Sequence, residues 1–226
     1  MNNANILNNL QIAEKKALQL FDEIIARKLI VSGKTELELN NEIYALATDL
    51  LAIEKFWHKR IVRAGKNTLF PYSENPPDLV FRDNEILFFD FGPVFEEWEA
   101  DIGKTFVLGT NESMHQIQRD SETIWEKASK FYQNNKSEIK ASDFYAYVSS
   151  LAEKAGWEYG NEHSGHIIGR FPHEKLLTDE IVNYIHPENN TKMNDLDRLG
   201  NERHWILEVH LIDREKEIGA FYERLM

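Results

Sequence analysis

Two aspartates stand in apolar, strand-like surroundings close together in the chain. Asp90 lies among Leu and Phe residues in the run 86–91, and Asp101 directly precedes the apolar run 102–108. A Gly-Pro pair follows the first run, so the stretch predicts a β-hairpin. An ionised carboxylate inside a buried strand is costly unless it is paired or ligates a metal. The two aspartates therefore indicate a shared cation; the alternative is one solvent-facing aspartate and one at the end of the hairpin.

Histidines gather in a second segment, GNEHSGHIIGRFPHE. It holds His163, His166 and His173, three of the eight histidines of the chain. Neutral imidazole nitrogens suit Zn, Mn, Fe or Co, so the cluster indicates metal ligands or substrate contacts. Each of these histidines taken alone is more often a surface or core residue.

Two glutamates near the C-terminus also stand in apolar company. Glu208 lies within WILEVHL, and Glu223 follows GAFY. The chain has no cysteine, so any metal site must use His, Asp and Glu side chains.

Apolar periodicity and turn residues predict the elements that position these side chains. A capping box formed by Thr35 and Glu38 is predicted to start the second helix. Helices are expected over residues 10–30, 36–53, 111–132 and 141–155. Residues 56–78 are expected to begin as a strand and to continue as a loop. Further strands are expected at 79–82, 86–91, 102–108, 205–212 and 218–222. Residues 177–203 are expected to form a long loop.

Length and composition fit an ordinary globular protein. The 226 residues allow one large core or two small ones, and 42% of them are hydrophobic. The formal net charge of −12 disfavours a phosphate backbone as partner, so no nucleic acid is expected. No apolar run is long enough to span a membrane, and the N-terminus lacks a signal-peptide pattern. A cytoplasmic protein without a membrane partner is expected.

Together these motifs resemble the metallopeptidases of the pita-bread fold, the family of methionine aminopeptidase, aminopeptidase P, prolidase and creatinase. That family has five metal ligands, and this sequence has a matching residue for each, in the same order. The segment DFGPVFEEWEADIGKTF would supply Asp90 and Asp101, SGHIIG would supply His166, LEV would supply Glu208, and FYE would supply Glu223. The GKTELE segment between the first two helices is similar too, so the resemblance covers nearly the whole chain. It implies an α/β (α+β) fold of two pseudo-symmetric halves. Residues 1–226 are expected to form a single catalytic domain without the separate N-terminal domain that proline-specific members carry.

The resemblance implies two divalent cations, which could be Mn, Co, Fe or Zn. Asp101 and Glu223 would bridge them, Asp90 would hold one, and His166 and Glu208 would hold the other. A pair of cations of this kind would hold the hydroxide that attacks an amide carbonyl.

The same resemblance implies catalytic roles. Glu208 would carry a proton to the leaving amine, and His173, with His163 assisting, would hold the carbonyl or the developing oxyanion. The alternative for His163 and His173 is a structural role in a loop.

Three positions depart from the proline-specific relatives. Pro71 stands where those relatives carry a histidine before the residue matching Tyr72, so a substrate-contacting histidine is expected to be missing. Phe221 stands where they carry an arginine. Val-His follows Glu208 in place of Pro-Gly, and strand alternation puts His210 on the same face as Glu208. Tyr72, His210 and Phe221 are therefore predicted to contact substrate; the alternative for His210 is a strand-edge role.

The expected function is that of a dinuclear metal-dependent aminopeptidase, Xaa-Pro or related, which cleaves the N-terminal bond of a small peptide. One alternative is a creatinase-like hydrolase of a non-peptide C–N bond. The other is a binding module that keeps the fold without turnover. The oligomeric state is left open, a homodimer included.

Overall fold

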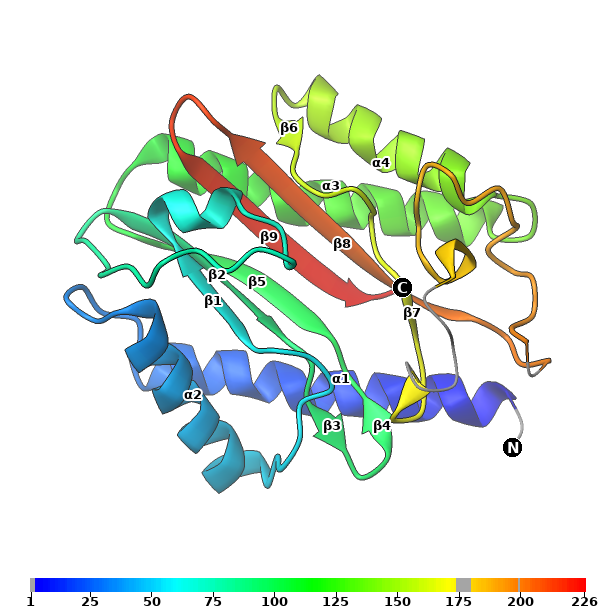
Figure 1. The fold of residues 1–226 in the computed structure, drawn as a ribbon, viewed down its shortest axis with the longest axis horizontal. Coiled ribbons are helices and arrows are strands. Elements are labelled where there is room, and N and C mark those ends of the chain that lie inside the picture. The colour runs from blue at the N-terminus through cyan, green and yellow to red at the C-terminus, as the bar shows by residue number, and fades with distance from the viewer. Residues whose placement is uncertain (1–2, 174–179, 199) are drawn as a thin grey trace.

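A mixed arrangement of helices and one large antiparallel sheet makes up the computed structural model, which describes residues 3–173, 180–198 and 200–226. The sheet has the strand order β1-β2-β5-β9-β8-β6, and β7 pairs with β8 (Figure 1). Its strands are β1 (Ile61–Ala64), β2 (Glu85–Phe91), β5 (Ile102–Leu108), β6 (Glu158–Tyr159), β7 (Ile167–Ile168), β8 (His204–Asp213) and β9 (Ile218–Leu225).

Two halves of similar construction follow one another along the chain. Helices α1 (Asn3–Ala26) and α2 (Glu36–Leu51) precede β1, β2 and β5, and helices α3 (Glu112–Asn135) and α4 (Ala141–Lys154) precede β6, β8 and β9. The strands of each half stay together in the sheet, and the halves join where β5 pairs with β9. This is the pseudo-symmetric layout that the sequence predicted.

The start of α2 shows why the helices begin where they do. Glu38 N donates to Thr35 Oγ1 at 3.1 Å, and Thr35 N donates to Glu38 Oε2 at 2.9 Å, so the predicted capping box is confirmed. Such a cap is worth about 1 kcal/mol to a helix. The helix then buries an apolar stripe formed by Leu39, Ile43, Leu46 and Ala47.

Alternation along the strands separates an apolar face of the sheet from a polar one. In β2, Leu87 and Phe89 belong to the core under α1 and α2, and in β8, Leu207 and Val209 belong to the core under α3 and α4. Figure 1 shows α1 and α3 behind the sheet. The opposite face, here called the open face, therefore receives the side chains that lie between these core residues in the sequence.

Some expectations differ from the observed elements. Residues 79–82 form no strand; only a single bridge joins Val80 to Thr35. The turn between β2 and β5 contains a second small hairpin, β3 (Val94–Phe95) with β4 (Trp98–Glu99). The predicted loop at 65–78 opens with a 3-10 helix, η1 (Gly65–Leu69). The predicted loop at 177–203 contains η2 (Ile181–Asn183), while residues 177–179 and 199 lie outside the described part.

In the described part of the chain, every helix is too short or too polar to cross a lipid bilayer.

Candidate metal centre

Strand register brings three of the predicted metal ligands into one row on the open face. Asp90 of β2 is paired with Gly103 of β5, Gly103 is paired with Glu223 of β9, and Glu223 is paired with Glu208 of β8. Paired residues of an antiparallel sheet point to the same face, so the three carboxylates project together. Asp101 lies two residues before Gly103 and is 2% exposed.

His166 joins the row from the segment that leads into β7. Its Nε2 atom lies 3.1 Å from Asp101 Oδ2 and 3.7 Å from Glu208 Oε1. Its Nδ1 atom lies 2.8 Å from the carbonyl oxygen of Ile167. A carbonyl only accepts hydrogen bonds, so Nδ1 carries the proton and Nε2 is the atom presented to the carboxylates.

A glycine permits this approach of His166. Gly165 has a φ of 132°, and a Cβ atom there would lie 2.0 Å from the carbonyl oxygen of Ile206. Only a residue without a side chain lets the segment lie so close to β8. The structure thus brings all five predicted ligands together, although they come from segments far apart in the sequence.

Burial sets the protonation of the carboxylates. Burial raises the pKa of Glu223 well above its ordinary value, and the negative charges of Asp101, Asp90 and Glu208 raise it further. Burial likewise raises the pKa of Glu208 to about 8 and that of Asp90 to about 6. For Asp101, burial would raise the pKa, but His58 and His166 outweigh it and lower the pKa to about 2.

The donor set fits divalent cations. Glu223 Oε2 is buried and has no hydrogen-bond partner among the residues that the structure describes. Such an atom is costly in a protein interior unless a ligand meets it. Two groups of side chains offer donor atoms within 4.8 Å of one another: His58, Asp90 and Asp101 form one, and Asp101, His166 and Glu223 form the other. Asp101 is common to both, as a ligand shared between two cations would be.

His58 also belongs to this site, although no sequence motif predicted it. It lies in the segment before β1, and its Nε2 atom is 3.1 Å from Asp101 Oδ1 and 3.4 Å from Asp90 Oδ1. Burial would lower the pKa of His58, but the charges of Asp90 and Asp101 raise it to about 9.

His173 and His163 lie at two different borders of this cluster. His173 forms an ion pair through Nδ1 with the buried carboxylate of Glu99. His163 Nδ1 accepts a hydrogen bond from Gly165 N at 3.2 Å and lies 3.6 Å from Glu208 Oε1. Burial, followed by the charges of His166 and His186, lowers the pKa of His163 to about 3, so its ring is neutral at physiological pH.

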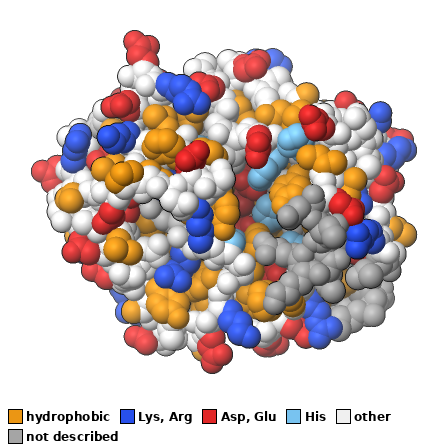
Figure 2. All heavy atoms as spheres, viewed as in Figure 1, with side chains coloured by type: hydrophobic (Ala, Val, Ile, Leu, Met, Phe, Trp, Pro, Cys, Tyr) orange, Lys and Arg blue, Asp and Glu red, His pale blue; other side chains and the backbone are white. Residues whose placement is uncertain are grey.

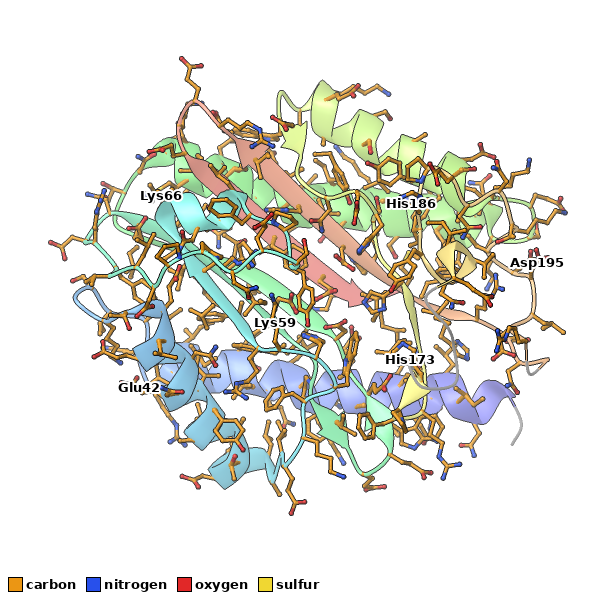
Figure 3. The ribbon with its side chains drawn as sticks, viewed as in Figure 1. Glu42, Lys59, Lys66, His173, His186 and Asp195 are labelled. Carbon is orange, nitrogen blue, oxygen red and sulfur yellow. The ribbon has the colours of Figure 1, made fainter. Side chains whose placement is uncertain are left out.

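Tyr72 lies beside His58. Their ring centroids are 5.6 Å apart in an edge-on arrangement, and the Tyr72 hydroxyl accepts a hydrogen bond from Lys59 N at 3.1 Å. In Figure 3, the labelled Lys59 and His173 mark the segments before β1 and after β7 that contribute side chains to the site.

His210 and Phe221 face each other in the next row of the open face. They are paired between β8 and β9, and their ring centroids are 6.0 Å apart. His210 Nε2 donates to the carbonyl oxygen of Thr68 at 2.8 Å, so this atom joins η1 to the sheet. Burial lowers the pKa of His210 to about 4. Phe221 forms a small buried cluster with Ile61 and Phe88.

The surface is hollowed over this part of the sheet. Figure 2 shows recessed acidic side chains near the centre of this face, with histidines and hydrophobic side chains around them.

Comparison with known proteins places these observations in a family. The family model for metallopeptidase family M24 matches residues 8–222. No curated protein matches the chain. The X-Pro aminopeptidase from Thermotoga maritima has a TM-score of 0.72 at 18% identity, covering 97% of this chain and 57% of that one. The prolidase from Thermococcus sibiricus has a TM-score of 0.69 at 21% identity, covering 96% and 55%. The methionine aminopeptidase from Thermotoga maritima has a TM-score of 0.67 at 18% identity, covering 98% and 92%.

The chain thus spans a little over half the length of the prolidase and the X-Pro aminopeptidase that it resembles. The solved structures confirm the pita-bread fold predicted from the sequence. Since the family model matches nearly the whole chain, the chain belongs to metallopeptidase family M24.

Proposed function

We propose that the chain is a metal-dependent aminopeptidase that hydrolyses the N-terminal peptide bond of a small peptide. The observation that carries the proposal is the buried cluster in which Asp101 is shared by two groups of cation donors. Asp90, Asp101, His166, Glu208 and Glu223 would hold two divalent cations of Mn, Co, Fe or Zn. When bound, such cations activate a water molecule and polarise an amide carbonyl.

Glu208 is proposed to carry the proton from the attacking water to the leaving amine. Asn161 Nδ2 donates to Glu208 Oε2 at 3.2 Å, and the Tyr159 hydroxyl donates to the Glu208 carbonyl at 2.7 Å. These contacts fix both the backbone and the carboxylate, which keeps Glu208 Oε1 on the side of His163 and His166. A general base that acts twice in one turnover benefits from such fixed geometry.

His173 is proposed to bind the substrate carbonyl. When its ring carries both protons, Glu99 is its counter-ion and Nε2–H is a cationic donor for an oxyanion. The Trp57 ring packs edge-on against both the His173 ring, at 5.4 Å between centroids, and the His166 ring, at 5.3 Å. One aromatic side chain therefore fixes the spacing of a proposed carbonyl donor and a proposed metal ligand.

Some finer predictions belong to this proposal. Residues 1–226 are expected to fold as one catalytic domain that acts in the cytoplasm, with a peptide as substrate and no nucleic-acid partner. The screen that tests for activity also tests whether Xaa-Pro peptides are preferred and which metal supports turnover.

The test is a metal-reconstituted screen of di- and tripeptides with Mn²⁺, Co²⁺, Fe²⁺ and Zn²⁺ in turn. Release of the N-terminal amino acid by the parent, and its loss in Asp101→Ala, would support the proposal. Absence of turnover on every peptide with metal bound would overturn it and favour a C–N hydrolase of another substrate class or a binding role.

A further inference from the structure

The segment that carries His58 is anchored between the two aspartates of the hairpin. Trp57 N donates to the carbonyl oxygen of Gly92 at 2.8 Å, and Trp57 Nε1 donates to the carbonyl oxygen of Ala100 at 3.0 Å. Gly92 lies two residues after Asp90, and Ala100 directly precedes Asp101. A Cβ atom at Gly92 would lie 2.3 Å from His58 Cδ2, so the glycine leaves room for the imidazole. The chain is therefore built to hold this ring against the carboxylate row.

The ring of His58 is oriented by its own backbone. Its side chain is 7% exposed, and Nδ1 lies 2.7 Å from the carbonyl oxygen of Lys59. A carbonyl oxygen accepts only, so Nδ1 carries a proton and Nε2 faces Asp101 and Asp90. Metal-ligating histidines are usually fixed in this way, with the second ring nitrogen donating to a carbonyl or carboxylate.

His58 reproduces the arrangement of the proposed ligand His166. Each ring directs Nδ1 to the carbonyl oxygen of the next residue, at 2.7 Å for His58 and 2.8 Å for His166. Each ring places Nε2 at 3.1 Å from Asp101, His58 at Oδ1 and His166 at Oδ2. Asp101 thus has an imidazole nitrogen at each of its two oxygens, one on the side of Asp90 and one on the side of Glu208.

We propose that His58 is a metal ligand. Its Nε2 atom, together with Asp90 and Asp101, binds the cation on the Asp90 side of the site. The inference rests on the proposed function for the presence of two cations. Two donor atoms that each lie about 2.1 Å from the same cation, and that are neighbours in its coordination shell, are roughly 3.0–3.4 Å from each other. The distances of His58 Nε2 to Asp101 Oδ1, 3.1 Å, and to Asp90 Oδ1, 3.4 Å, have this spacing.

This ligand changes the chemistry of the site. The five predicted ligands place their single imidazole at one cation, whereas His58 gives an imidazole to each. Imidazole favours Zn, Co, Ni and Fe over Mg and Ca, which prefer oxygen. The cation on the Asp90 side should therefore be a transition metal, and its retention should depend on His58.

The experiment titrates metal-free protein with Co²⁺ and follows the heat of binding and the visible ligand-field absorption. The variants are His58→Ala and His58→Gln, and His115→Ala serves as control, since His115 lies in the first turn of α3 and contacts Gly109. The parent and the control are expected to bind two equivalents of Co²⁺. Both His58 variants are expected to bind one equivalent of Co²⁺ with the affinity of the parent. They should bind the second equivalent on the order of 10-fold more weakly or worse, and their visible absorption should differ from that of the parent.

Folding is checked separately by circular dichroism and by thermal unfolding of each metal-free protein. His58→Gln keeps a polar side chain of similar length, so it reports on the ligand if His58→Ala fails to fold. Two equivalents bound at parental affinity with an unchanged spectrum in a folded His58 variant would overturn the inference. So would an effect confined to KM, which would make His58 a substrate contact. Metal-loaded parent that binds both cations but cleaves no peptide would defeat the proposed function and leave the ligand assignment standing.

Discussion

Glu99 of β4 and His173 are joined by an ion pair between the Glu99 carboxylate and His173 Nδ1. The backbone N–H of His173 also donates to Glu99 Oε1, at 3.3 Å. The Glu99 side chain is fully buried, and in the part of the chain that the structure describes both of its carboxylate oxygens contact His173. A buried carboxylate that orients a histidine is a positioning residue for any proton or hydrogen bond that the histidine supplies.

The first prediction is that Glu99→Gln slows peptide hydrolysis and leaves metal content unchanged. The amide keeps the size of the side chain but removes the carboxylate that pairs with His173 Nδ1, so the imidazole should be held less firmly against the substrate carbonyl. The effect is measured as kcat and KM of the variant, together with its metal content. Glu97→Gln is the control, since Glu97 lies two residues away and pairs at the surface with Arg170. Unchanged kcat and KM in Glu99→Gln would assign the contact between Glu99 and His173 to folding alone.

The second prediction concerns the proposed bridging carboxylates. Asp101→Ala and Glu223→Ala should each lose most of both metal equivalents, because each removes a donor that serves two cations. The loss is measured by elemental analysis of protein dialysed against each metal. Asp78→Ala is a suitable control, since Asp78 caps the start of α2 through Leu37 N at 3.0 Å. Unchanged metal content in both site variants would defeat the assignment of the bridges.

The third prediction separates metal binding from turnover. Glu208→Gln should retain at least part of the metal and lose turnover, because an amide oxygen can ligate but the amide does not accept a proton as a carboxylate does. His173→Ala should retain metal and lose rate on the order of 10²-fold or more, as expected for a donor to an oxyanion. Both are read from kcat and from metal content. Parental activity in His173→Ala would leave this histidine with a structural role only.

Part of the site was predicted from acidic residues in apolar company, and the family resemblance supplied the ligand set. Asp90 and Glu208 each lie between residues that enter a hydrophobic core, which is why the structure places both carboxylates on the opposite face. Glu99 carries the same signal, an acidic residue between Trp98 and Ala100, and could have been found by the rule that identified Asp90.

His58 carries no comparable local signal. Its position against Asp101 depends on contacts 43 residues apart along the chain, including the hydrogen bond from Trp57 to Ala100. Such tertiary contacts decide where an irregular segment lies, and periodicity does not report on them. The absence of a strand at 79–82 has the same origin, since this segment is held by bonds to the start of α2, where Glu36 N donates to Leu79 O and Gly33 N donates to Phe81 O.

The fourth prediction is a pH dependence of stability caused by Glu36 at the start of α2. Glu36 is 7% exposed, and its carboxylate accepts hydrogen bonds from Ala64 N at 2.6 Å, Asn67 Nδ2 at 3.0 Å and Leu79 N at 3.3 Å. Burial raises its pKa from 4.5 to about 7 in spite of these bonds. Below pH 4.5 the folded and unfolded chains are both protonated here. Between pH 4.5 and 7 only the unfolded chain releases the proton, so this group lowers the free energy of unfolding as pH rises.

Glu36→Gln should remove that contribution. The free energy of unfolding of the variant minus that of the parent should rise between pH 4.5 and pH 7 and level off above it. Urea unfolding at four pH values across this window measures the difference. Glu54→Gln, at an exposed position beyond α2, controls for the loss of one negative charge. A difference that is constant with pH would show that Glu36 does not titrate as described.

The last prediction concerns substrate choice, and it begins with the apolar part of the open face. Phe221 and Phe88 lie 5.2 Å apart between ring centroids and form a buried cluster with Ile61 beside the carboxylate row. Arg63 shares this face through its pairing with Phe88, but its guanidinium donates to the carbonyl oxygens of residues 70, 71 and 74. The arginine is thus committed to holding that loop and is not presented to a substrate.

Phe221 is apolar and Arg63 is held by the loop, so neither would offer a positive charge to a substrate carboxylate next to the cleaved bond. A buried charge without a partner is costly. Tripeptides and C-terminally blocked dipeptides should have higher kcat/KM values than free Xaa-Pro dipeptides. Phe221→Arg should narrow this difference by restoring a cation, and Phe221→Leu, which is apolar, should not. Steady-state kinetics on matched di- and tripeptides decide the matter. A parent preference for Xaa-Pro dipeptides on the order of tenfold would contradict the role given to Phe221, because it would require a carboxylate-binding group elsewhere in the site.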